Sequence, residues 1–337
     1  MRPECPQAIH DHLGDGEWTP YSRPPARPEP AEAPGPEPDA EGAPGRVAAA
    51  DPDATGGETA GADRARVDHV GGGHAWLVGE QIVRRHPSST PAVAEAERTA
   101  WLTAALAGPA ASAGDGLTDD DGGRSVGDDG DDDERRAAAS RWGLRAGPAA
   151  LVIDGAWSLT PRPDGAPAHR PDLHPRPDSL PATIGTALAR LHALDVDACP
   201  TARSTAEVVD EVRNAITADR LVVDLLPAPY DRYPAERLLA MIDEAPLRPA
   251  DPVVAHGAPL LANLWPTLGG DGATVIGLHH LGVAERTADL AVIHRQLQDG
   301  FGPEAVFAFY EAYGQHPDLV ALDHQLLIDA VRSAIIP

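Results

Sequence analysis

Two long stretches of this sequence cannot contribute to a folded core, and they limit what the other residues can build. Residues 22–66 are dominated by Pro, Ala, Glu, Asp and Gly, and residues 108–140 carry runs of Asp and Gly. Such segments bury too little apolar surface to offset the entropy lost on ordering them. We therefore expect both to be disordered. A third Pro-rich stretch, residues 161–179, is expected to be a solvated linker.

These stretches divide the chain. About 240 residues remain for folding, which is enough for two lobes that each have a core. The expected parts are a mostly disordered segment at 1–66, an N-terminal lobe hairpin and helix at 67–107, the acidic insertion at 108–140, N-lobe strands and a hinge at 141–160, the linker at 161–179, and a helical C-terminal lobe at 180–337.

Local periodicity predicts the elements of the N-terminal lobe. Residues 74–86 read as a β-hairpin with Gly79 at its turn, because two apolar runs flank a glycine. Residues 92–106 have the apolar spacing of a helix. Residues 149–159 contain a continuous apolar run and are expected to form one strand. The first lobe is therefore expected to be small and rich in strands.

The C-terminal lobe is expected to be mainly helical. Ile184, Leu188 and Leu191 repeat at helical spacing. Pro303 at a first helical position and Gly314 at a stop delimit another helix. The other predicted elements are a strand at 253–255, a hairpin at 264–278 and a helix that begins near Leu319. The fold class is thus α+β, with strands concentrated in the first lobe.

Composition excludes several functions. The formal net charge is −25, so a broad basic surface for nucleic acid is excluded, and cationic small molecules are more plausible partners. All 27 basic residues are arginine, since the sequence contains no lysine. Two cysteines are too few for a disulfide framework, and no apolar run approaches the roughly 20 residues that span a bilayer. We expect a cytoplasmic protein without a membrane segment.

One segment has the spacing of a kinase catalytic loop. In such loops an Asp two residues after a His accepts the proton of the substrate hydroxyl, and an Asn five residues later holds Mg²⁺. Here His256 and Asn263 stand at that spacing, but the Asp position is Ala258. The candidate catalytic loop therefore lacks its general base.

The chain resembles the aminoglycoside 3′-phosphotransferase family, which has a two-lobed, protein-kinase-like fold. The similarity rests on HGAPLLAN at residues 256–263, IGLHHLGVAERTADLA at 276–291 and EAERTAWL at 95–102. It extends over most of the chain from about residue 67, and the LGVAER and DLA runs are its most specific parts. The resemblance implies ATP and Mg²⁺ as cofactors and a hydroxyl of an aminoglycoside as the acceptor.

The resemblance also implies roles for individual residues. Glu95 would pair with the group that replaces the ATP lysine, and Arg84 or Arg85 falls near that place. The metal position would be shared by Asn263 and Gly277, but Gly277 stands where the family has an Asp. The remaining implied positions are a loop over the phosphates at Gly71, Gly72 and Gly73, and substrate-binding acids at Asp224, Glu285 and Asp329.

Three charged groups are therefore missing together: the general base, a metal ligand and the ATP lysine. General base catalysis alone typically contributes 10²- to 10⁴-fold. One hypothesis is a catalytically impaired, pseudokinase-like protein that binds a nucleotide, a cationic small molecule or a protein partner. The other is an active ATP-dependent phosphotransferase with unusual catalytic residues.

Some neighbouring residues have both functional and structural interpretations. His279 or His280 could bind a metal ion, although adjacent histidines more often serve packing. Asp271 is expected at a hairpin tip, directed away from the cleft. His256 and Asp289 are expected to support the loop rather than react.

Overall fold

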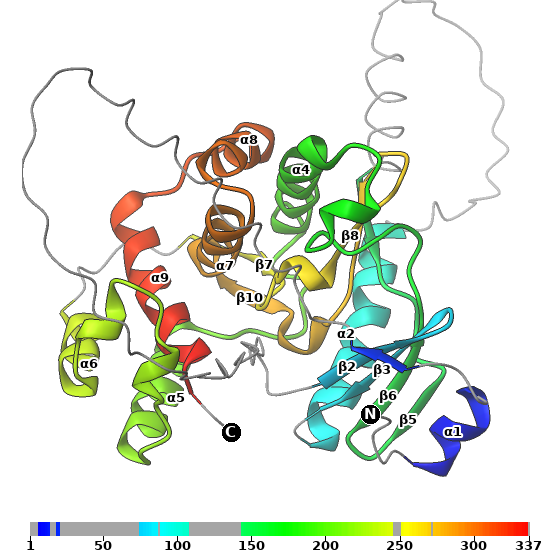
Figure 1. Cartoon of the computed structure of the whole chain (residues 1–337), viewed down its shortest axis with the longest axis horizontal. Coiled ribbons are helices and arrows are strands. Elements are labelled where there is room, and N and C mark those ends of the chain that lie inside the picture. The colour runs from blue at the N-terminus through cyan, green and yellow to red at the C-terminus, as the bar shows by residue number, and fades with distance from the viewer. Residues whose placement is uncertain are drawn as a thin grey trace, which may run out of the picture.

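The computed structural model describes residues 6–13, 18–20, 74–86, 88–107, 143–244, 251–270 and 272–335. They form a small lobe rich in strands and a larger helical lobe (Figure 1). This is the two-lobed α+β architecture expected from the sequence. The two stretches expected to be disordered, the Gly71–Gly73 loop and Asp271 lie outside the described residues.

The small lobe is built on a five-stranded antiparallel sheet with the order β1-β2-β3-β6-β5. The expected hairpin is confirmed, with Gly79 at its turn in the left-handed region (φ +60°). A core of Ile9, Val83 and Leu159 lies between helix α1 and the sheet. Its elements are α1 (Gln7–Leu13), β1 (Trp18–Pro20), β2 (His74–Val78), β3 (Gln81–Arg85), β5 (Val152–Asp154) and β6 (Trp157–Pro161).

The prediction of a single strand at residues 149–159 is wrong. The segment forms two strands, β5 and β6, joined by a tight turn. Gly155 in that turn has φ +57°, a conformation that glycine adopts without the steric cost a side chain would bring. The apolar run hid a hairpin because its turn has only two residues, Gly155 and Ala156, between the strands.

The helix expected at residues 92–106 is confirmed and is slightly longer, as α2 (Ser89–Ala107). It packs against the short turn η6 (Leu278–His280) of the large lobe. Its Leu102 is fully buried in the core of that lobe. Helix α2 therefore connects the two lobes and carries Glu95 toward the large one.

The large lobe combines helices with short strands. Strand β7 pairs antiparallel with β10, whereas β9 pairs antiparallel with β8 and parallel with β4. The helices are α4 (Leu180–His192), α5 (Thr205–Thr217), α6 (Ala235–Asp243), α7 (Arg286–Gly300), α8 (Pro303–Tyr313) and α9 (Leu319–Ser333). The strands are β4 (Gly143–Ala146), β7 (Pro252–Ala255), β8 (Leu264–Pro266), β9 (Gly272–Val275) and β10 (Gly282–Glu285).

Helices α4 and α8 pack against each other along their lengths in the large lobe. A Cβ at Gly185 would lie 2.4 Å from the carbonyl oxygen of Phe309, so glycine allows the two backbones to approach. The predicted helical face of Ile184, Leu188 and Leu191 is buried in the same core. The expected stop at Gly314 is also present, with φ +81°.

The Pro-rich segment at 161–179 connects β6 to α4, and the expectation that it is solvated holds for its exposed residues 175–179 but is wrong for its first half. It contains the short turns η1 (Pro171–Leu173) and η2 (Pro177–Ser179). Ala166, Ala168 and His174 are buried, and Ala168 N donates to Leu264 O at 2.8 Å. Proline fixes the backbone dihedral φ, so such a segment can lie along a surface at little entropic cost.

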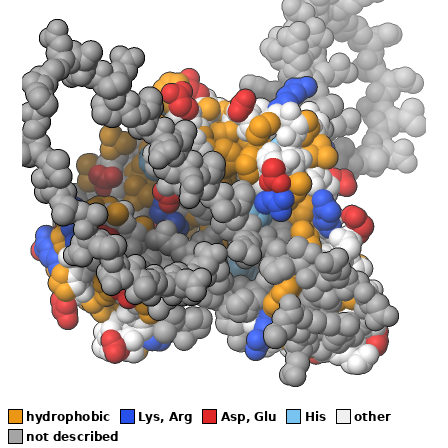
Figure 2. Space-filling view, viewed as in Figure 1, with side chains coloured by type: hydrophobic (Ala, Val, Ile, Leu, Met, Phe, Trp, Pro, Cys, Tyr) orange, Lys and Arg blue, Asp and Glu red, His pale blue; other side chains and the backbone are white. Residues whose placement is uncertain are grey.

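The described surface mixes both charge signs. Figure 2 shows acidic and arginine side chains interspersed over the face in view, without one broad basic patch there. Across the described residues, no helix has the length and apolar character needed to cross a bilayer.

Two phenylalanines of α8 test the role of the α4–α8 packing. Phe309 is completely buried, whereas Phe307 on the same helix is 64% exposed. We expect Phe309→Ala to lower the free energy of unfolding by about 3–5 kcal/mol, because it removes buried apolar surface and leaves a cavity. Phe307→Ala is the matched control and should change it by less than about 0.5 kcal/mol in urea unfolding. Equal losses in the two variants would contradict this packing.

Candidate active site

The loop after β7 is held by a buried carboxylate. Asp289 of α7 accepts the backbone N–H of His256 at 2.6 Å and of Gly257 at 2.9 Å. His192 of α4 donates Nε2–H to the same carboxylate at 3.1 Å, and Tyr313 hydrogen-bonds to the other nitrogen of His192 at 2.8 Å. Burial alone would raise the pKa of Asp289, but His192 and these bonds hold it below its ordinary value. Asp289 therefore anchors the loop, as expected.

His256 also has a supporting position. It is fully buried, and its Nε2 hydrogen-bonds to the carbonyl of Ile276 at 3.0 Å. Burial lowers its pKa, although Asp289 acts in the opposite direction. The ring is therefore neutral at pH 7, and its hydrogen bond ties the loop to the end of β9.

An ion pair joins strand β3 to helix α2. Arg84 Nη1 of β3 lies 2.5 Å from Glu95 Oε1 of α2, and both side chains are largely buried. Arg85 points elsewhere, with its guanidinium 5.8 Å from the ring centre of Trp157. Of the two arginines left open by the sequence, Arg84 is thus the partner of Glu95. Burial would raise the pKa of Glu95, but Arg84 and the nearby histidines hold it below its ordinary value.

The same ion pair reaches the candidate metal position. Arg84 Nη2 donates to Asn263 Oδ1 at 3.3 Å, and Asn263 Nδ2 donates to the carbonyl of Ala258 at 3.1 Å. Gly277 N donates to Glu95 Oε1 at 2.9 Å. One network therefore joins five of the positions that the sequence placed at the base, metal and nucleotide sites: Arg84, Glu95, Ala258, Asn263 and Gly277.

These residues do not fit a magnesium ion. Mg²⁺ needs oxygen ligands in near-octahedral geometry, but Asn263 Oδ1 already accepts from Arg84, and neither Ala258 nor Gly277 supplies an oxygen from a side chain. A Cβ at Gly277, where φ is +75°, would lie 2.8 Å from the Asn263 side-chain atoms. Within the described part of the chain, no group of three His, Cys, Asp or Glu side chains could hold a metal ion.

Three histidine side chains, those of His86, His279 and His280, lie next to one another near Glu95 of this network. The rings of His279 and His280 are 4.2 Å apart, and His86 meets His279 edge-on at 6.0 Å. Burial lowers the pKa of His279 to about 4, although Glu95 opposes it. The hypothesis that His279 or His280 binds a metal therefore gains no support, because the pair forms no ligand cluster with other described side chains. His86 was missed in the sequence, since nothing in its local pattern distinguishes it.

The three candidate substrate acids have separate surroundings. Asp224 is exposed in η3 (Val223–Leu225), and Glu285 accepts the backbone N–H of Asp251 at 3.0 Å. Asp329 of α9 is buried and pairs with Arg295 at 2.8 Å. Of the three, only Asp329 lines a cavity beside Gly257 of the loop. Among the described residues, these three side chains lie in separate surroundings and do not form one amine-binding site.

Comparison with known proteins identifies the family. Residues 65–323, well over half of the chain, match the model of the phosphotransferase enzyme family, APH. The chain belongs to this family. A streptomycin 3″-kinase of Streptomyces griseus is 33% identical over 204 residues, which cover 54% of this chain and 73% of the relative. An aminoglycoside 3′-phosphotransferase of Streptomyces fradiae is 33% identical over 167 residues, 48% of this chain and 62% of the relative.

Solved structures support the same fold. An aminoglycoside phosphotransferase of Streptomyces rimosus superposes with a TM-score of 0.54 at 21% identity, covering 77% of this chain and 90% of that one. A type VIII aminoglycoside 3′-phosphotransferase gives 0.55 at 22% identity, with coverages of 77% and 88%. At these identities the similarity establishes the protein-kinase-like fold of this APH-family chain.

The buried histidines predict how stability depends on pH. His279 has a pKa of about 4 in the folded protein and an ordinary value of 6.5 when unfolded. Between these values the unfolded chain binds a proton that the folded chain does not, so stability falls as pH decreases. We expect the titration of His279 to lower the free energy of unfolding by about 2 kcal/mol at pH 5 relative to pH 7. Urea unfolding at several pH values measures the change.

The control for this experiment is a histidine outside the core. In the His279→Gln variant, the decrease in the free energy of unfolding between pH 7 and pH 5 should be about 2 kcal/mol smaller than in the unaltered protein. His316→Gln removes an exposed histidine between α8 and α9 and should leave the dependence unchanged. A His279→Gln variant that retains the full pH dependence would show that this ring does not contribute to it.

Proposed function

We propose that this APH-family protein keeps the kinase fold but does not carry out Mg²⁺-dependent phosphoryl transfer. The observation that carries the proposal is the position of Arg84, whose guanidinium contacts both Glu95 and Asn263. A permanent cation thus lies against the amide oxygen that a metal ion would need. Bringing Mg²⁺ to the same oxygen would require displacing Arg84 from its ion pair.

The residue at the position expected for the general base supports the same proposal. Ala258 is 1% exposed, and its carbonyl accepts from Asn263. A methyl group cannot orient a substrate hydroxyl or accept its proton, and the described neighbours supply no substitute: Glu95 is engaged by Arg84 and by Gly277 N. The chain keeps the residues that hold the loop in place, such as Asp289 and His256, but it lacks the side chains that would act on the substrate.

The nucleotide role of Arg84 is a separate part of the proposal. Its charge could neutralise phosphates without a metal ion, but a planar guanidinium does not reproduce the contacts of a lysine ammonium. We therefore expect any ATP bound in the cleft to bind independently of Mg²⁺. The streptomycin and ADP complex known for the Streptomyces rimosus relative makes ATP and streptomycin suitable probes.

The first test is a phosphoryl-transfer assay with radiolabelled ATP, Mg²⁺, and streptomycin or kanamycin as acceptor. We expect no transfer above background from the protein as it exists. We also expect none from Ala258→Asp. A general base typically accelerates the reaction by about 10²- to 10⁴-fold, but it does not supply the missing metal site. Ala258→Asn is the matched neutral variant. Mg²⁺-dependent transfer by the unaltered protein would overturn the proposal.

The second test is thermal unfolding with ATP in the presence of Mg²⁺ or of EDTA. We expect the same unfolding temperature in both conditions, since the guanidinium of Arg84 lies against the amide oxygen of Asn263 and would repel the metal ion. Arg84→Gln should remove any shift caused by ATP. An ATP-induced shift that needs Mg²⁺ would show that the metal site is functional.

A further inference from the structure

The two faces of the small-lobe sheet have different partners. Strands β2 and β3 pair so that Leu77 lies opposite Ile82, and Ala75 lies opposite Arg84. Residues that pair directly share a face of a sheet, and neighbours along a strand alternate between faces. These four residues therefore share one face, while the core beneath helix α1 lies on the other. Because Arg84 contacts Asn263, the face of these four residues is directed toward the large lobe.

Trp265 of strand β8 meets this face from the large lobe. Its neighbour Leu264 is buried in the main core together with the cross-strand partner Val275, so Trp265 is directed to the opposite side of the strand. There it packs in an apolar cluster with Ile82 of β3 and Ile276. The partly buried members of the cluster are Ala75, Leu77 and Ala262. The indole thus joins the small-lobe sheet to the large lobe.

The remaining sides of the indole are also engaged. The guanidinium of Arg162 lies 5.6 Å from its ring centre, at cation–π distance. Arg162 belongs to the segment that connects the lobes, and its backbone N–H donates to the carbonyl of Glu80 at 2.8 Å. The Nε1–H of Trp265 donates to the carbonyl of Ala262 at 3.2 Å. The ring is therefore enclosed by both lobes and their connection, and its polar atom has a partner.

This apolar cluster lies directly beside the polar network of the candidate site. Ile82 shares a sheet face with Arg84, two residues away, and Ile276 immediately precedes Gly277. Ligand sites combine apolar walls with a few polar groups that fix orientation. A nucleotide with its phosphates at Arg84 would need an apolar slot for its base nearby. Among the described residues, this cluster supplies the apolar surface next to Arg84.

The cluster contains no such slot. A flat ring contacts its neighbours at about 3.5–4 Å on each face, so the walls of a slot must stand about 7 Å apart. Here the opposing walls pack against each other, with Ile82 1% exposed and Trp265 0% exposed. A ring that entered would have to displace the indole.

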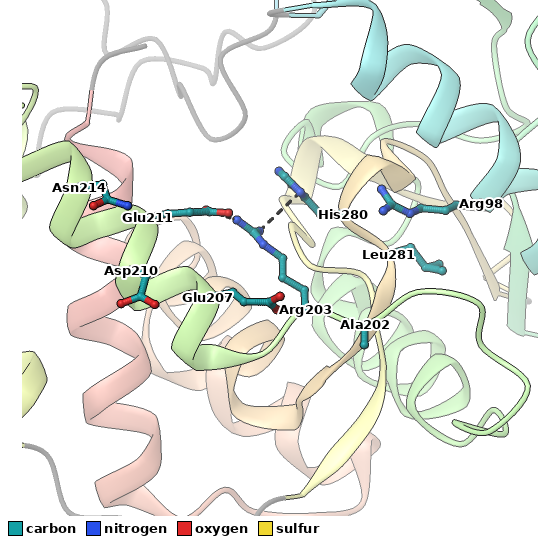
Figure 3. A pocket seen from close by; sticks show the side chains of 9 residues that line it. All are labelled: Arg98, Ala202, Arg203, Glu207, Asp210, Glu211, Asn214, His280 and Leu281. Atoms are coloured by element: carbon teal, nitrogen blue, oxygen red, sulfur yellow. Dashed lines mark hydrogen bonds and ion pairs between the residues drawn. The ribbon is translucent and has the colours of Figure 1, made fainter.

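The open space near the loop lies elsewhere. Figure 3 shows a pocket of about 470 Å³ between α2 and α5, where Arg98, Arg203 and His280 lie among the lining residues. Charged and polar side chains dominate its walls, and three of them are carboxylates of α5. Neither Arg84 nor any member of the apolar cluster lines it. This pocket therefore gives no apolar slot that continues from Arg84.

We propose that the indole of Trp265 occupies the space between the two lobes that the base of a nucleoside would need, so that the chain closes its own cleft. The ATP expected from the sequence would find a partner for its phosphates in Arg84 but no place for its base. Opening that place would break the buried contacts of Trp265 with both lobes and with Arg162. The proposal concerns the base alone and stands whether or not phosphoryl transfer occurs.

The test is calorimetric titration of the full chain with adenosine, which carries the base without phosphate and needs no Mg²⁺. We expect the unaltered protein to show no saturable binding up to about 1 mM. Trp265→Ala should bind adenosine at least about tenfold more tightly than that limit, because an apolar cavity left by a large side chain accepts a small ring. Indole should bind to this variant and compete with adenosine.

The matched control removes the same side chain from the other face of the sheet. Trp157 is nearly buried in the core beneath α1, so Trp157→Ala opens a space there and leaves the cleft closed. This variant should bind no adenosine. Near-UV circular dichroism shows which variants are folded. Should Trp265→Ala fail to fold, Trp265→Leu is the second variant, since it keeps apolar volume but removes the ring.

Four results would overturn the proposal. Saturable adenosine binding by the unaltered protein would show that the cleft is open. A folded Trp265 variant that binds neither ligand, or an equal gain in Trp157→Ala, would show that the indole does not fill a ligand site. Indole binding without adenosine binding would show a space that fits a ring but not a nucleoside. None of these results depends on the phosphoryl-transfer assay, because neither phosphate nor Mg²⁺ is present.

Discussion

The buried carboxylate of Asp289 is the interaction on which the candidate active site depends. It accepts two backbone N–H groups of the loop after β7 and a ring N–H of His192, so three elements (α4, α7 and the loop) meet at one fully buried charge. An unpaired charge at that depth would be very costly, whereas one with three donors is stabilised. Tyr313, Arg286 and Asp251 extend the network to the surface. The backbone of the loop is thus held in place independently of any side chain that would react.

Much of this arrangement could be predicted from the residues. The hairpin at 74–86, the helix carrying Glu95 and the strand leading into His256 all follow from local periodicity and turn residues. The spacing of His256, Asn263 and Asp289 also located the loop and its support. Local patterns succeed here because each element buries one continuous apolar face.

Other features could not be predicted, because they depend on contacts between distant residues. The turn at Gly155 was hidden by the apolar residues around it, and the Pro-rich stretch was expected to be solvated although Ala168 packs in the main core. His86 had no local signal either. The choice between Arg84 and Arg85 also required the structure, since adjacent residues of a strand point to opposite faces.

The network of Arg84, Glu95, Asn263 and Gly277 has a consequence for which substitutions the cleft tolerates. Each residue now makes the others harder to change: a side chain at position 277 would meet Asn263, and Asn263 is bonded to Arg84. Replacing any one of these residues alone therefore disturbs a contact that the others make. The four positions behave as one unit, and a substitution at one of them is accommodated only together with changes at its neighbours.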